Sequence, residues 1–137
     1  MLDHPRGPAL LDAVARLLRD VLLPALPPGN AAFQARVAAN AVDLAAREMR
    51  LGPAADAAAL DRLQALLQHA ADGAGLDALE AELALAIRSG AIDADDPGLR
   101  AHLWAGTLDK LAIDQPSYAP YRRAVALRAA PPTSTPE

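Results

Sequence analysis

The sequence predicts an all-α protein, a compact bundle of five main helices followed by a short C-terminal helical turn. Composition is the first basis for this prediction: 53% of the 137 residues are hydrophobic but only 3% are aromatic. Alanine and leucine, which favour helices, are far commoner than the β-branched residues that favour strands. The second basis is periodicity, because apolar residues recur at steps of three and four along most of the chain. A chain of this length forms one domain, which we place at residues 1–128.

The first helix is expected from residue 9 to residue 23. Its apolar stripe at helical spacing consists of Leu10, Val14, Leu17 and Val21, widened by Leu11, Leu18 and Leu22. Such a wide stripe predicts a broad buried face. The prolines and the glycine of segment 24–29 then prevent regular continuation, and Asn30 is the expected N-cap of the helix that starts near residue 31.

The second and third helices are separated by Gly52 and Pro53 in this prediction. Glycine is favoured just past a helix end and proline just inside a helix start. The second helix therefore ends near Leu51 and the third opens at Pro53. The apolar positions of the second are Phe33, Val37, Leu44 and Leu51, and those of the third are Leu60, Leu63, Leu66, Leu67 and Ala70.

The fourth and fifth helices follow further turn signals. Gly73 and Gly75 precede a segment with the apolar positions Leu76, Leu79, Leu83 and Ile87. Gly90 should end that helix. Asp95 or Asp96 is the expected cap of the fifth helix, which reaches about Ile113.

The chain after the fifth helix is expected to turn at Pro116. Tyr118 should then be at least partly buried against the fifth helix, because an amphipathic ring closes the end of a bundle well. A last helical turn is expected at residues 124–128. The proline-rich segment 129–137 has little to bury and is predicted to be a disordered tail.

Composition and charge exclude several classes of function. The absence of cysteine excludes disulfides and thiol catalysis. The formal net charge of -4 argues against a nucleic-acid partner. The start lacks a signal-peptide core and no stretch approaches ~20 apolar residues, so a cytoplasmic protein with no membrane partner is expected. The abundant alanine, with Lys110 as the only lysine, indicates a GC-rich bacterial source.

The sequence carries no recognisable metal, cofactor or catalytic motif. Segment 93–96 resembles the start of a calcium loop, but Trp104 stands where a bidentate carboxylate is needed, so helix capping is preferred. The histidines His4, His69 and His102 lack the spacing of zinc or di-iron ligands and are expected at the surface. We therefore expect no metal, no cofactor and no catalytic residue.

Three polar residues fall on or beside otherwise apolar helix faces, namely Asn40, Glu48 and Arg100, the last one turn before Trp104. If the second and fifth helices pack together, Glu48 and Arg100 form an ion pair that Asn40 orients. One interpretation is a buried polar network that fixes helix register. The other is a ligand pocket in which these groups bind a polar head while leucines enclose an apolar tail. The sequence leaves both open.

The C-terminal part carries a local basic patch formed by Arg122, Arg123 and Arg128 beside Tyr118 and Tyr121. Its positive charge is suited to an acidic partner, so this patch is a candidate partner surface. The alternative is a solvated, charged end of the domain.

Four segments carry a resemblance to a known family: RVAANAVDLAARE (36–48), LGPAA (51–55), IRSGAIDADDPGLRAHLW (87–104) and KLAIDQPSY (110–118). In order and spacing they resemble a family of bacterial helical domains of unknown function, over roughly residues 3–121. Gln115 stands where that family more often has asparagine. Its members are typically encoded beside, or fused to, kinase-like proteins similar to aminoglycoside phosphotransferases, often near acyl-CoA dehydrogenases. The resemblance implies a partner and carries over no catalytic residue.

The functional expectation is a non-catalytic accessory or interaction domain. The resemblance alone implies its partner, a phosphotransferase-like kinase in acyl-CoA or other small-molecule metabolism. One alternative is an independent ligand-binding bundle for an apolar or acyl compound. The other is an enzyme that uses Glu48 as a general base. Each of the three is compatible with a homo-oligomer.

Overall fold

The computed structural model describes residue 4 and residues 7–68 and 73–129, and all regular structure within them is helical. This confirms the predicted all-α fold. In chain order the elements are α1 (Pro8–Arg16), the π-helical segment η1 (Leu17–Leu22), α2 (Leu23–Ala25), α3 (Asn30–Leu67), α4 (Leu76–Ser89), α5 (Pro97–Asp114) and α6 (Ala119–Ala129). No described helix combines the length and the apolar character that crossing a membrane would require.

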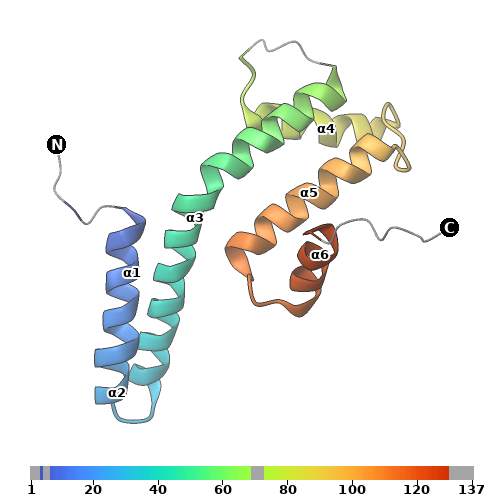
Figure 1. Ribbon diagram of the computed structural model, residues 1–137. Coiled ribbons are helices and arrows are strands. Elements are labelled where there is room, and N and C mark those ends of the chain that lie inside the picture. Colours follow the sequence, from blue (N-terminus) through green and yellow to red (C-terminus); the bar gives the residue numbers. More distant parts are fainter. Residues whose placement is uncertain (1–3, 5–6, 69–72, 130–137) are drawn as a thin grey trace.

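The long helix α3 organises the fold (Figure 1). Its first half runs antiparallel to the continuous helix formed by α1, η1 and α2, and the two make a helical hairpin. Its second half packs against α4 and α5, while α6 follows α5 after a short turn. One helix therefore connects the N-terminal hairpin with the C-terminal group of helices.

The predicted break at Gly52 and Pro53 is wrong, because α3 continues through both residues for 38 residues in all. A proline inside a helix removes one backbone donor and costs roughly 3 kcal/mol. The helix is packed against other helices on both sides of Pro53, and this packing offsets the local cost. The helix changes direction near its middle (Figure 1), as helices commonly do at an interior proline.

The predicted helix ends are partly confirmed. Gly90 ends α4 in the left-handed conformation, with a φ of 76°, and the Asp96 side chain caps α5 by accepting a hydrogen bond from the Leu99 N–H at 2.8 Å. The α3 helix ends earlier than predicted, with Gln68 as its left-handed C-cap at a φ of 56°. Asn30 is not a cap but the first helical residue, with no side-chain capping bond.

The C-terminal end also departs from the prediction. The expected turn at 124–128 is part of the longer helix α6, which begins at Ala119 and ends at Ala129. The first residue of the predicted tail is thus helical. The remaining tail residues, 130–137, lie outside the described residues, as does His69.

The main core lies where the second half of α3 meets α4 and α5. It consists of the buried residues Leu63, Leu79, Leu83 and Leu99. Several predicted apolar positions pack around this core, including Leu60, Leu66, Leu67 and Leu76. Burial of one such leucine side chain stabilises the fold by about 1.5–3 kcal/mol, so these three helices hold most of the hydrophobic stabilisation.

The hairpin is packed differently, through a seam of small residues. Ala15 of α1 and Ala39 and Ala46 of α3 are buried almost completely. Alanine lets the two helix backbones approach closely, but it buries little apolar area. The hairpin therefore gains less from hydrophobic burial than the C-terminal core does.

The predicted apolar faces of the hairpin are only partly buried: Leu11, Leu18 and Leu44 are half-buried, and the other large apolar residues are exposed. Five residues, here named the α1 stripe, each keep between 38% and 57% of their surface exposed: Leu10, Val14, Leu17, Val21 and Leu22. On α3, Phe33, Val37 and Leu51 are exposed as well. The reason is that α1 and α3 contact each other through the faces that carry the buried alanines. The faces that carry most of the large apolar residues are turned away from this contact.

Candidate functional site

The structure separates the polar residues that the sequence grouped on apolar faces. Glu48 is exposed on α3, and Arg100 on α5 lies beside Asp95, with 3.8 Å between guanidinium and carboxylate. Within the described residues Glu48 and Arg100 form no ion pair, so the predicted pairing is wrong. Trp104 is 58% exposed. The faces that carry these residues are largely open to solvent, so this set is not a buried network.

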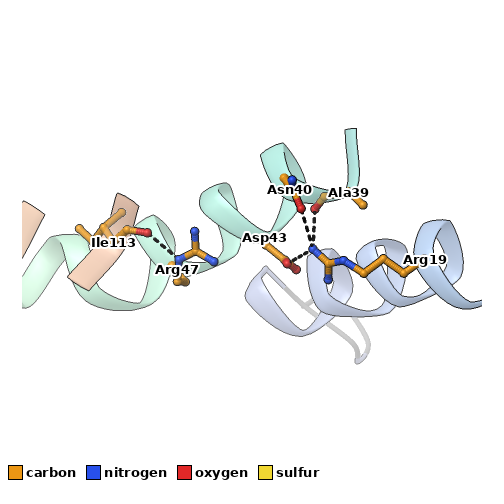
Figure 2. A network of polar contacts seen from close by, with 6 residues as sticks. All are labelled: Arg19, Ala39, Asn40, Asp43, Arg47 and Ile113. Carbon is orange, nitrogen blue, oxygen red and sulfur yellow. Dashed lines mark hydrogen bonds and ion pairs between the residues drawn. The ribbon is translucent and has the colours of Figure 1, made fainter. Parts of the chain in front are cut away.

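Asn40 instead belongs to a polar network that connects the two arms of the hairpin (Figure 2). Its centre is the Nη2 atom of Arg19 in η1, which donates to Asn40 Oδ1 at 3.3 Å and to the Ala39 carbonyl oxygen at 3.4 Å. The same guanidinium forms an ion pair with Asp43. The hydrogen bond to Asp43 raises the pKa of Arg19, so the guanidinium stays charged.

This network has a structural role. Arg19 and Asp43 are partly exposed, and pairs of this kind contribute on the order of 0.5–1 kcal/mol. A second ion pair, between Arg50 and Asp12, fixes the other end of the same two helices. Together the two pairs connect the arms of the hairpin at two places along their length.

A cleft lies on α3 beside this network. Arg47 Nε donates to the carbonyl oxygen of Ile113 at 2.5 Å and thereby ties α3 to the C-terminal end of α5 (Figure 2). Next to this bond, a cleft of about 710 Å³ opens between α3 and segment 114–118. Asn40 and Tyr118 both line it. Tyr118 is 47% exposed, which agrees with the expectation of a ring that is at least partly buried, and it lines this cleft together with residues of α3.

The predicted basic patch lies at and beside α6. Arg122, Arg123 and Arg128 are exposed, while Tyr121 is half-buried. The Arg122 N–H donates to the Tyr118 carbonyl oxygen at 3.1 Å, which places Tyr118 at the start of the helix. The three arginines are thus exposed on α6, but their helical spacing distributes them around the helix and not on one face.

A second cavity, here named the α3–α5 groove, lies among α3, α4 and α5 and has a volume of about 640 Å³. Its walls are largely aliphatic, with Leu76, Leu83 and Ile87 from α4 and Leu103 and Ile113 from α5. Polar side chains also line it, among them Arg62, Glu80, His102, Asp109 and Lys110. Neither this groove nor the cleft beside Asn40 is lined by Glu48.

Two buried nitrogen atoms in the groove have no hydrogen-bond partner: Nε of Arg62 and Nδ1 of His102. Arg62 uses its Nη2 atom for an ion pair with Asp109 at 3.1 Å. His102 is only 9% exposed, so the expectation of a surface histidine is wrong at this position. Burial, together with the charge of Arg62, lowers the pKa of His102.

Sequence reasoning placed His102 at the surface and did not single out Arg62. The one signal for His102 is its position three residues after Leu99, which places the two on the same side of α5; the structure buries both. Arg62 had no comparable signal in the sequence. It is partly buried because it pairs with Asp109 on another helix, and the sequence does not show which helices meet. Among the described residues, no group of three or more potential ligands could hold a metal ion.

The described residues form an all-helical domain with a long central helix, the groove and cleft described above, and an exposed apolar stripe. Residues 24–118 match the family described as Domain of unknown function (DUF6285), and the chain belongs to that family. The matched segment contains both cavities, whereas α1 and η1 lie outside it. No curated protein and no solved structure matches the chain.

Proposed function

We propose that the protein is a non-catalytic interaction domain that binds a partner protein through the α1 stripe. One observation carries the proposal: the stripe has the periodic pattern of a buried helix face, yet the folded chain leaves it about half exposed. Contiguous apolar surface of this kind commonly marks a protein–protein interface.

The size of the stripe supports this function. Its five aliphatic side chains together expose on the order of 400 Å². In a standard interface each partner buries about 800 Å², of which somewhat over half is non-polar. The stripe is therefore close in size to the non-polar part of one side of such an interface. No other described helix covers the stripe, because α1 packs only against α3 and η1 among the described elements.

The resemblance to helical domains encoded beside kinase-like proteins supports one occupant for this surface, a phosphotransferase-like kinase in acyl-CoA or other small-molecule metabolism. In this proposal the domain contributes binding surface and no catalytic group. The exposed patch of Arg122 and Arg123 on α6 adds a second surface that an acidic region of the kinase can contact.

The test is co-expression of the tagged chain with the phosphotransferase-like kinase of the same genome, followed by size-exclusion chromatography with mass determination. Wild type should elute as a stoichiometric complex. Leu17→Glu should weaken the complex at least about tenfold, because it places a charge in an apolar interface. The matched control is Leu85→Glu on α4, at a position that is 61% exposed and away from the stripe.

The other outcomes contradict the proposal in different ways. A complex that tolerates Leu17→Glu would exclude the α1 stripe as the binding surface. Absence of any complex would exclude the kinase as the partner. A homodimer that Leu17→Glu dissociates would show that a second copy, and not the kinase, covers the stripe.

The two alternatives differ in the support that they have. A ligand-binding role for the bundle is supported by the largely aliphatic α3–α5 groove. A catalytic role for Glu48 has no comparable support, because this exposed carboxylate lines neither of the two cavities.

A further inference from the structure

The α3–α5 groove has the length and the lining of a slot for one helix. Helices α4 and α5 both pack on α3, but their backbones stay apart, with no pair of Cα atoms from the two within 8 Å. The groove follows residues 76–87 of α4 and 102–113 of α5, and each of these walls is about 16 Å long. Ile87 and Leu103 on the two walls keep 37% and 50% of their surface exposed. Apolar grooves of this kind receive helices in many protein complexes.

Gly106 lies in the α5 wall of the groove, within the helix. Glycine is less favourable than alanine inside a helix, and it is typically found there where another group approaches the backbone closely. No neighbouring helix of the described chain does so, because a Cβ atom added at Gly106 would meet nothing within 4 Å. The open space beside Gly106 therefore fits an occupant whose backbone lies close to α5.

The charges along the groove favour a basic occupant. Arg62 and Asp109 line the groove and neutralise each other in an ion pair. The remaining charges are the carboxylates of Asp56 and Glu80 against the single cation of Lys110. Asp56 and Glu80 are exposed, and neither makes an ion pair within the described residues.

Helix α6 is the element of this chain that matches the groove. With 11 residues it is also about 16 Å long. It is the one described helix that carries arginine and no acidic residue, although the chain as a whole has a formal net charge of -4. Only Tyr121 and Ala124 of α6 are half-buried, and Leu127 is 78% exposed. Most of this basic helix is thus free to contact a second molecule.

We propose that two copies of the chain form a dimer in which α6 of each copy lies in the α3–α5 groove of the other. The charged ends of Arg122 and Arg123 pair with Asp56 and Glu80, while their aliphatic stems and Leu127 cover the apolar walls. Each copy gives one helix and receives one, so the arrangement closes with twofold symmetry. The α1 stripe stays free for the kinase in this dimer, whereas the arginines of α6 contact either the second copy or the kinase.

The experiment is sedimentation equilibrium of the full chain over a range of concentrations, which separates the 14.2 kDa monomer from a dimer of twice that mass. Wild type should form the dimer. Gly106→Leu fills the space beside α5 and should raise the dissociation constant at least about tenfold. Circular dichroism should show that this variant keeps its helices, because leucine favours a helix and the space beside Gly106 is open. The matched control is Ala101→Leu, at an exposed position of α5 outside the groove.

Charge reversal tests the proposed ion pairs. Arg122→Glu combined with Arg123→Glu should raise the dissociation constant at least about tenfold, and so should Asp56→Arg combined with Glu80→Arg. All four changes in one chain should restore much of the affinity, because the complementary charges are exchanged. Damage to the fold alone would not be repaired in this way.

A wild type that stays monomeric over the whole concentration range would overturn the proposal. A dimer that tolerates Gly106→Leu would exclude the groove as the contact, and lack of recovery in the fourfold variant would exclude the ion pairs. Leu17→Glu should leave the dimer intact, and dissociation by this change would place the contact at the α1 stripe instead. None of these measurements involves the kinase, so failure of this proposal is distinct from failure of the proposed interaction through the α1 stripe.

Discussion

The division of the molecule into a buried leucine core and an exposed α1 stripe makes one quantitative prediction about two leucines. Leu63 is completely inaccessible, whereas Leu17 has about half of its surface exposed. Leu63→Ala removes buried methylene and methyl groups and leaves a cavity among Leu79, Leu83 and Leu99. Substitutions of this type cost roughly 3–5 kcal/mol. For a domain of this size the melting temperature should fall by on the order of 10 °C.

Leu17→Ala should have a much smaller effect on the isolated chain. Only part of the side chain leaves an apolar environment, no cavity forms, and alanine has the higher helix propensity. The free energy of unfolding should therefore change by less than about 1 kcal/mol. The assay is urea denaturation followed by circular dichroism for both variants at two protein concentrations. A loss for Leu17→Ala as large as that for Leu63→Ala would refute the reasoning, because it would show that the stripe is buried in the free protein.

Three further predictions concern the backbone and one titrating group. Pro53→Ala should raise the free energy of unfolding by up to about 3 kcal/mol, because Pro53 lies inside α3. If chemical denaturation shows unchanged or lower stability, a helix begins at Pro53 instead. Gln68→Gly should stabilise by about 0.5–1 kcal/mol in the same assay, because Gln68 holds a left-handed φ of 56° that glycine adopts without strain; destabilisation would contradict that conformation. The third prediction concerns pH. Because burial and Arg62 lower the pKa of His102, the unfolded chain binds more protons below the ordinary pKa of 6.5, and the free energy of unfolding should fall as pH drops from 7 toward 5. The charges of Lys110 and Glu80 also act on this histidine. In chemical denaturation, the free energy of unfolding of His102→Leu should depend less steeply on pH. An equally steep dependence in the variant would assign the effect to other groups.

The sequence was sufficient for those features that local chemistry determines. The all-α class and Gly90 as the end of α4 were predicted correctly, and Asp96, one of the two expected caps, is the cap of α5. Three leucines of the C-terminal core, Leu63, Leu79 and Leu83, also lie on predicted apolar stripes, whereas the fourth, Leu99, was not predicted. In these cases the local preference and the tertiary structure agree.

The prediction failed where tertiary packing overrides a local rule. Proline was taken as a helix start, yet the packing of α3 on both sides of Pro53 keeps the helix continuous. The predicted pair of Glu48 and Arg100 required one particular rotation of α3 relative to α5. A single sequence gives no information about how two helices are rotated relative to each other. The observed partner of Asn40 is Arg19, brought into place by the hairpin and the π-helical segment.

The groove shows a similar limit at the level of the site. His102 lies three residues after the buried Leu99 and so on the same side of α5, which is a weak signal for its burial, but the missing partner of its Nδ1 atom had no signal. That property depends on Arg62 and on the walls that α3 and α4 supply. Histidine and arginine that are far apart in the sequence come to line one groove only through the packing of three helices.

Hydrogen–deuterium exchange on the protein with and without the phosphotransferase-like kinase tests the central claim most directly. If the kinase covers the α1 stripe, amides of α1 and η1, residues 8–22, should exchange at least about tenfold more slowly in the complex, since binding suppresses local opening. Amides of the C-terminal core around Leu63 should change much less. Unaltered exchange across residues 8–22 in a confirmed complex would contradict the assignment of the α1 stripe as the binding surface.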